Sequence, residues 1–164
     1  MEKEISAGII IYRKTNKGPK FLLLYHGHNY WNFPKGKLET GQKFIEGGMV
    51  QEREKSFHAA IREVREETGL GRNDLKFFGL FRASEQFTFW RQNKKIFKTV
   101  IFYLAETPKK DIKLSSEHEG FGWFSYKEAV KTLGNRKGNQ IVLKQAFDAL
   151  QKPIGAIVGK RTVC

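Results

Sequence analysis

The sequence predicts a single domain with an α+β or α/β/α layered fold. Strand-like segments are mixed with a few helical ones, at spacings that suit a sheet covered by helices. The 164 residues are enough to bury a core, and a hydrophobic content of 40% with 14 Phe is typical of globular proteins. No repeat, low-complexity run or Pro/Ser linker divides the chain, so we expect one domain over residues 1–164.

The elements follow from short apolar runs bounded by turn residues and from helical periodicity. The predicted strands are residues 5–12, 20–25, 76–83, 86–91, 96–105 and 120–124. The predicted helices are residues 55–68, 126 to about 133, and 140–150. Gly69 is suited to end the first helix, and the pair Ser125 and Glu128 forms a capping-box pattern that opens the second.

The most informative run, residues 62–70, contains Glu63, Glu66 and Glu67. On a helix the spacings i, i+3 and i+4 place these carboxylates on one face, where like charges repel each other. Such a cluster needs solvent or a cation, and a hard divalent cation such as Mg²⁺, with Mn²⁺ as an alternative, suits carboxylates and usually accompanies phosphate. The alternative is a solvated helix face with Arg62 and Arg65 as partners.

The run extends into the pattern G-x5-E-x7-R-E-U-x-E-E-x-G-U, where U is apolar, from Gly48 through Glu54 to Leu70. It resembles the Nudix box, the signature of enzymes that hydrolyse a nucleoside diphosphate linked to another moiety. In that family the first glycine usually belongs to a W-x-F-P-K-G-like segment, which here ends at Gly36. We therefore expect an insertion at about residues 43–53, which forms a mobile surface loop beside the phosphate site.

Further motifs across residues 4–133 are similar to the asymmetrical diadenosine tetraphosphate hydrolases of this family. They are the apolar strands at 6–12 and 21–24, the W-x-F-P-K-G loop at 31–36, the K-T-V strand at 98–106, and the L-S-x-E-H pattern at 114–119 before a tryptophan. The resemblance implies a Nudix-type α/β/α sandwich with a mixed sheet flanked by helices. It also implies a metal-dependent pyrophosphohydrolase that acts on phosphoanhydride bonds, chiefly converting diadenosine tetraphosphate to ATP and AMP.

Candidate site residues follow from the charge pattern and from the resemblance. The expected catalytic residues are Glu63, Glu66 and Glu67, with Arg62 either orienting these carboxylates or serving as a plain i, i+4 partner of Glu66. The expected metal ligands are the same three glutamates, Glu117 and the carbonyl of Gly36. The expected substrate-binding residues are Lys35 and Lys98 on phosphate, Phe121 with Phe89 or Phe87 on a base, and His28 near phosphate. Relatives use Tyr at these aromatic positions, so stacking is retained but a hydroxyl hydrogen bond is lost.

Net charge and cysteine content bound the remaining choices. A formal charge of +13 favours polyanionic partners, which include a small nucleotide substrate and, as an alternative, RNA. Removal of pyrophosphate or a cap from an RNA 5′ end is therefore the second candidate function, and a non-catalytic nucleotide-binding module is the third. Apolar runs too short for a membrane, the absence of a signal-peptide pattern and a single cysteine, Cys164, lead us to expect a cytoplasmic protein. The oligomeric state is not indicated by the sequence.

Overall fold

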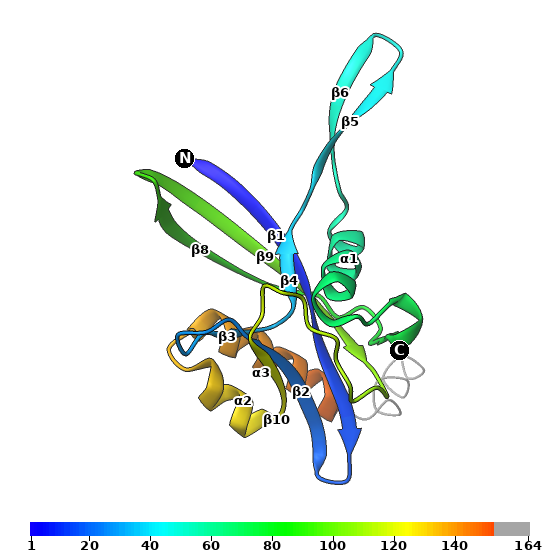
Figure 1. Ribbon diagram of the computed structural model, residues 1–164, viewed down its shortest axis with the longest axis vertical. Helices are drawn as coiled ribbons and strands as arrows, with labels where there is room; N and C mark the ends of the chain where they lie inside the picture. Colours follow the sequence, from blue (N-terminus) through cyan, green and yellow to red (C-terminus); the bar gives the residue numbers. More distant parts are fainter. Residues whose placement is uncertain (153–164) are drawn as a thin grey trace, which may run out of the picture.

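The computed structural model describes residues 1–152, with the side chains of 41–45 and 50 left aside. Within this range one eight-stranded sheet has the order β10-β2-β1-β9-β7, with β3 paired to β2, β4 to β1 and β8 to β9 (Figure 1). The parallel pair is β1 with β9, and the other pairs are antiparallel, so the sheet is mixed. The strands are β1 (Glu2–Thr15), β2 (Gly18–Tyr25), β3 (Trp31–Asn32), β4 (Lys35–Lys37), β7 (Lys76–Phe77), β8 (Ala83–Arg91), β9 (Lys94–Glu106) and β10 (Gly120–Ser125).

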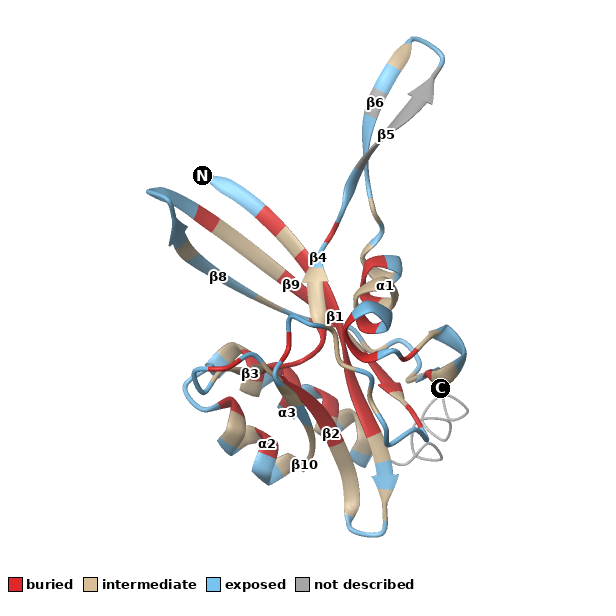
Figure 2. Cartoon of the chain, in the orientation of Figure 1, coloured by how far each residue is buried: buried red, intermediate tan, exposed pale blue. Residues whose placement is uncertain are grey.

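Helices cover both faces of the sheet, which confirms the predicted layered α+β fold. On one face α1 (Ser56–Thr68) packs through Ala59, Ala60 and Val64 against a cluster that includes Ile9 and Ile11 of β1. On the other face α2 (Tyr126–Leu133) and α3 (Lys137–Gln151) pack against a separate cluster. Because side chains alternate along a strand, β1 supplies both cores, and its centre is the most buried part of the chain (Figure 2). None of the helices in residues 1–152 has the length and apolar character needed to cross a membrane.

The helix termini agree with the predicted signals. Gly69 ends α1 in the left-handed conformation, with φ of 77°, which glycine adopts without steric cost. The Ser125 hydroxyl accepts a hydrogen bond from the backbone N–H of Glu128, and the Glu128 carboxylate accepts one from the N–H of Ser125. Helix α3 begins at Lys137, three residues before the predicted start, and the amide of Gln140 donates to carbonyls at the end of α2.

The predicted strand at residues 76–83 was mostly wrong, because only Lys76 and Phe77 pair with β9. The chain then turns through Gly79, with φ of 43°, and Leu80 is 95% exposed before β8 begins at Ala83. The apolar sequence of this segment therefore does not reflect sheet pairing.

The predicted mobile loop at residues 43–53 was also wrong in its secondary structure. Strands β5 (Thr40–Ile45) and β6 (Gly48–Arg53) form a regular antiparallel hairpin, separate from the main sheet, with its register running from Thr40 opposite Arg53 to Ile45 opposite Gly48. Figure 1 shows this hairpin projecting away from the body of the molecule. Glycines at 47 and 48 allow the tight turn, since both have positive φ.

A second extension is formed by the start of β1 together with the paired ends of β8 and β9 (Figure 1). We call residues 2–5, 86–91 and 94–99 the wing. Its strands are in continuous register, with Glu2 opposite Ile96 and Arg91 opposite Lys94 at the tip.

Candidate active site

The carboxylates of α1 are held by close contacts with the backbone of β4. Glu67 is buried, and its Oε2 accepts a hydrogen bond of 3.0 Å from the backbone N–H of Lys35. Glu63 lies against Gly36 so closely that a Cβ at that position would stand 1.9 Å from the Glu63 carboxyl carbon. A side chain at position 36 would therefore displace the Glu63 carboxylate, whereas a Cβ at Gly48 would meet nothing within 4 Å. Gly36 is thus the glycine that faces the carboxylates, and the fit of Gly48 to the box spacing is a coincidence.

Arg62 connects the box glutamates to one another. Its Nε and Nη2 each donate to the Glu54 carboxylate at 2.9 Å, which is a bidentate pair. Its Nη1 donates to Glu63 at 2.9 Å and to Glu66 at 3.3 Å. The hydrogen bond from Arg62 is the main reason that the pKa of Glu54 lies below its usual value. Arg62 therefore contacts Glu66 at i+4 and also holds the carboxylates of Glu63 and Glu54, of which Glu54 lies outside the helix.

Burial and mutual repulsion keep two of the carboxylates from ionising easily. Burial, then the charge of Glu63, raises the pKa of Glu67 to about 8. Burial also raises the pKa of Glu63, against the opposing hydrogen bond from Arg62. Glu117, in the exposed loop before β10, raises the pKa of both groups further. The Glu63, Glu67 and Glu117 carboxylates are thus close enough to repel one another, although Glu117 is far from α1 in the sequence.

The donor set suits a divalent cation, because carboxylate oxygens are the ligands that Mg²⁺ and Mn²⁺ prefer and a cation would relieve the repulsion that raises these pKa values. In the part of the chain that the structure describes, no three His, Cys, Asp or Glu side chains already converge in an arrangement that could hold a metal ion. Glu63 and Glu66 are instead turned toward Arg62. Coordination would therefore require these carboxylates to reorient.

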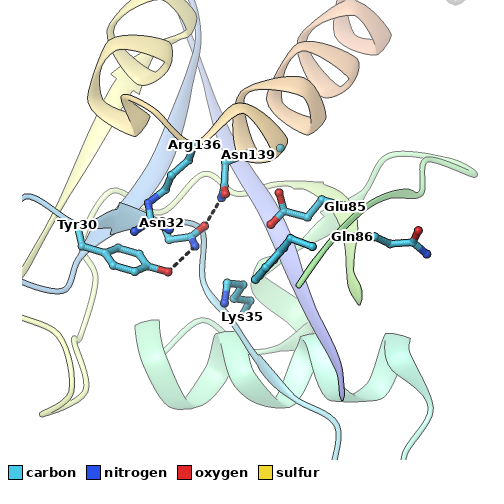
Figure 3. A pocket seen from close by; sticks show the side chains of 9 residues that line it. Tyr30, Asn32, Lys35, Glu85, Gln86, Arg136 and Asn139 are labelled. Atoms are coloured by element: carbon cyan, nitrogen blue, oxygen red, sulfur yellow. Dashed lines mark hydrogen bonds between the residues drawn. The ribbon is translucent and has the colours of Figure 1, made fainter. Parts of the chain in front are cut away.

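A pocket of about 260 Å³ lies beside this cluster, between β3, β8 and the start of α3 (Figure 3). Its polar wall is a chain of hydrogen bonds, in which Asn139 donates to Asn32 and Asn32 donates to the Tyr30 hydroxyl at 3.0 Å. The Arg136 guanidinium lies 3.5 Å from the centre of the Tyr30 ring. In Figure 3 the Glu85 side chain points toward the cavity, while that of Gln86 points away from it.

Lys35 joins the pocket to the carboxylates, since its backbone N–H binds Glu67 while the residue also lines the pocket. Burial lowers the pKa of the Lys35 ammonium, against the raising effect of Glu67 and Glu85. Burial also lowers the pKa of Lys98, and the charge of Lys35 lowers it further. The Lys35 and Lys98 ammonium groups thus repel each other in a poorly solvated site. A bound phosphate chain would reduce this repulsion, because its negative charges would neutralise both amines.

The structure brings together only some of the predicted substrate residues. Lys35 and Phe87 line the pocket, Lys98 stands opposite Phe87 in the sheet register, and the Phe89 ring lies 6.0 Å from that of Phe87. Phe121 is on β10, at the opposite edge of the sheet from β8, and does not line this pocket.

His28 also lies outside the pocket lining. It occupies an exposed turn between β2 and β3, with a left-handed backbone at φ of 51°.

Of the nine residues that line the pocket, only Lys35 and Phe87 were among the predicted site residues, and the seven that were missed include Glu85, Arg136 and Asn139. Arg136 precedes α3 and Asn139 lies in its first turn, just beyond the residues covered by the recognised motifs. Gly138 of the same turn gave no signal, because the predicted helix began only at residue 140. Here a Cβ at position 138 would stand 2.2 Å from Oε2 of Glu85, so glycine permits the close approach of β8 to α3.

Comparisons with known proteins agree with this geometry. The family profile described as NUDIX domain matches residues 2–145. The chain is 30% identical over 155 residues to the asymmetrical bis(5′-nucleosyl)-tetraphosphatase of Sus scrofa, with 88% of this chain and 94% of that protein covered. It is 33% identical to the Mus musculus protein of the same name, over 77% of this chain and 82% of that one. Among solved structures, a binary complex of the C. elegans Ap4A hydrolase matches with a TM-score of 0.68 and 27% identity, over 90% of this chain and 96% of that chain.

Proposed function

Because the chain belongs to the NUDIX domain family, we propose that it is a divalent-metal-dependent hydrolase of dinucleoside polyphosphates, which converts diadenosine tetraphosphate to ATP and AMP. The names of its relatives in pig, mouse and C. elegans support this choice of substrate within the family.

The observation that carries the proposal is the double role of Lys35. A substrate with both a nucleoside and a phosphate chain needs a pocket for one part and charge stabilisation for the other. Lys35 belongs to the wall of the pocket, while its backbone N–H is fixed by Glu67 of the carboxylate cluster. A nucleoside in the pocket would thus have its phosphates directed past Lys35 toward α1, with Lys98 as a second cation.

The residues take distinct roles in this proposal. Glu63, Glu66 and Glu117, with the Gly36 carbonyl, would hold the cation, which when bound supplies Lewis-acid activation of water and phosphate oxygens. Glu67, whose Oε2 is held by the backbone N–H of Lys35, would take the proton of the attacking water once the bound cation has lowered its raised pKa. The water oxygen joins phosphorus, the bridging P–O bond breaks, and the leaving phosphate is stabilised by Lys35. Arg62 holds the carboxylates in place through Glu54.

The test is a substrate panel with Mg²⁺ in H₂¹⁸O, read by product mass. The panel contains diadenosine tetraphosphate, ADP-ribose, NADH, a diphosphoinositol phosphate, and capped and triphosphorylated RNA. We expect diadenosine tetraphosphate to give ATP and AMP with ¹⁸O in only one product. Glu46→Gln, an exposed carboxylate in the turn of the hairpin, serves as the matched control for substitutions at α1. If the protein hydrolysed another class of substrate in the panel and no dinucleoside polyphosphate, the proposal would be overturned.

A second candidate, hydrolysis at the 5′ end of RNA, is favoured by the net charge of +13, which exceeds what a small nucleotide requires. The RNA substrates in the same panel decide between the two. A purely binding module is a weaker candidate, because the box retains all three α1 glutamates together with Glu54 and Arg62.

A further inference from the structure

The wing carries a row of aromatic and cationic side chains that begins in the pocket. Phe87, Phe89 and Arg91 alternate along β8 and therefore project from the same face of the sheet. The two rings are 6.0 Å apart, and the Arg91 guanidinium lies 5.1 Å from the Phe89 ring centre. Phe87 is 42% exposed although it is a large apolar residue, and it also lines the pocket. The row is thus a continuous platform that leads outward from the candidate active site.

Cations flank this row and are fixed by one buried carboxylate. Lys98 stands opposite Phe87 and Lys94 stands opposite Arg91, so both share the face of the row. Glu4 of β1, whose side chain is 2% exposed, forms ion pairs with Arg91, with Lys98 at 3.9 Å and with Lys37 at 3.7 Å. Glu2, opposite Ile96, adds a second carboxylate to this face, so the two glutamates stand against Lys37, Arg91, Lys94 and Lys98 and the face keeps a positive excess. Glu4 holds three of these cations, Lys37, Arg91 and Lys98, beside the rings.

We propose that this face of the wing, formed by Phe87, Phe89 and Arg91 with the flanking Lys94 and Lys98, binds single-stranded nucleic acid. Successive bases stack on the rings and on the guanidinium plane, and the lysines follow the backbone phosphates. Aromatic stacking combined with a cationic track is the usual means by which proteins bind single strands without sequence preference. A duplex hides its base faces, so it could use only the charges.

The opposite face of the wing offers a competing surface and a control. Trp90 is 70% exposed and stands opposite Lys95, so it also pairs an aromatic ring with a cation. Because side chains alternate, Trp90 points away from the face that carries Phe89. Only the Phe87 face is continuous with the pocket, which is why we assign the nucleic acid to it. Trp90→Ala is thus a control on the same strand, at a more exposed aromatic residue of the opposite face.

The inference does not rest on the proposed reaction, and its test avoids hydrolysis altogether. The probe is a 3′-labelled 12-nucleotide RNA with a 5′-hydroxyl, titrated in EDTA and followed by fluorescence anisotropy at several salt concentrations. Phe89→Ala should raise Kd about tenfold or more, in line with the stacking of one base. Arg91→Gln should weaken binding several-fold and reduce the salt slope by about one. Trp90→Ala should keep Kd within about twofold, and a duplex of equal length should compete poorly.

Other outcomes overturn the proposal. Absence of binding at low salt, equal competition by the duplex, or loss of binding in Trp90→Ala with normal binding in Phe89→Ala would each reject this face. If Phe89→Ala does not fold, Arg91→Gln and Lys94→Gln, both exposed positions, replace it, and normal binding by both would reject the platform. A chain that binds the RNA but hydrolyses no dinucleoside polyphosphate would support the platform and contradict only the proposed function.

Discussion

Glu67→Gln should stabilise the metal-free protein at alkaline pH while leaving its stability near pH 5 unchanged. Glu67 has a folded-state pKa of about 8 against an ordinary value of 4.5. Between these two values the folded protein keeps a proton that the unfolded chain has lost, so the free energy of unfolding falls as pH rises, by about 1.4 kcal/mol per pH unit. The difference of 8 − 4.5 pH units sets a ceiling of about 5 kcal/mol on the loss. Rotation of the carboxylate toward water lowers the expected loss to about 2–3 kcal/mol.

Glutamine removes the ionisation and keeps the shape, since its carbonyl oxygen can still accept the hydrogen bond from Lys35 N–H. The assay is urea unfolding in EDTA from pH 4.5 to 9, followed by tryptophan fluorescence. The wild type should lose more stability toward pH 8 than the variant, which keeps only the smaller loss from the other carboxyls with raised pKa, Glu63 and Glu85, and Mg²⁺ should restore much of the wild-type loss. Glu66→Gln, which alters an exposed carboxylate on the same helix, should follow the wild type. Parallel profiles for wild type and Glu67→Gln would refute the reasoning.

Three further predictions concern the surroundings of the site. Gly36→Ala should lower kcat by at least about tenfold with the fold retained, because the new Cβ displaces the Glu63 carboxylate. Gly71→Ala, where a Cβ would have no neighbour closer than 3.8 Å, is the control and should leave kcat unchanged in the same assay. Replacing residues 42–51 by a short turn should shift Tm by only a few degrees and alter mainly KM, since the hairpin is separate from the main sheet. If the shortened protein no longer unfolded cooperatively, this prediction would be wrong. Phe87→Ala should raise KM for diadenosine tetraphosphate about ten- to a hundredfold and Phe121→Ala much less, because only Phe87 lines the pocket; the reverse order in steady-state kinetics would move the base site to β10.

The layered fold was predictable because local signals and burial agree along most of the chain. The alternation of Ile9, Ile10 and Ile11 between two cores follows from strand geometry. The glycine after α1 and the capping box before α2 mark boundaries by the hydrogen bonds that they make. The segment after residue 77 was misread, because an apolar sequence in a turn looks like a strand when its partner is unknown. The hairpin was misread for the opposite reason, since charged and glycine-rich sequence is typical of loops as well as of isolated hairpins.

The candidate site was predictable on the side of α1 and less so on the side of the pocket. The positions of Glu63 and Glu67 follow from helical spacing, and the carboxylate cluster could therefore be expected. The pocket is built from β3, β8 and α3, which meet only in the folded chain, so no spacing rule predicts the contact between Glu85 and Gly138. For the same reason the sequence did not indicate that Phe121 lies at the far edge of the sheet.

The most direct test of the account is the turnover of diadenosine tetraphosphate by Glu67→Gln at saturating Mg²⁺, with Glu46→Gln measured in parallel. Because the α1 carboxylates are assigned to the metal-supported step, Glu67→Gln should keep its fold and lose several orders of magnitude in kcat, while Glu46→Gln should match the wild type. Near-normal turnover by a correctly folded Glu67→Gln would contradict the assignment of these carboxylates to catalysis.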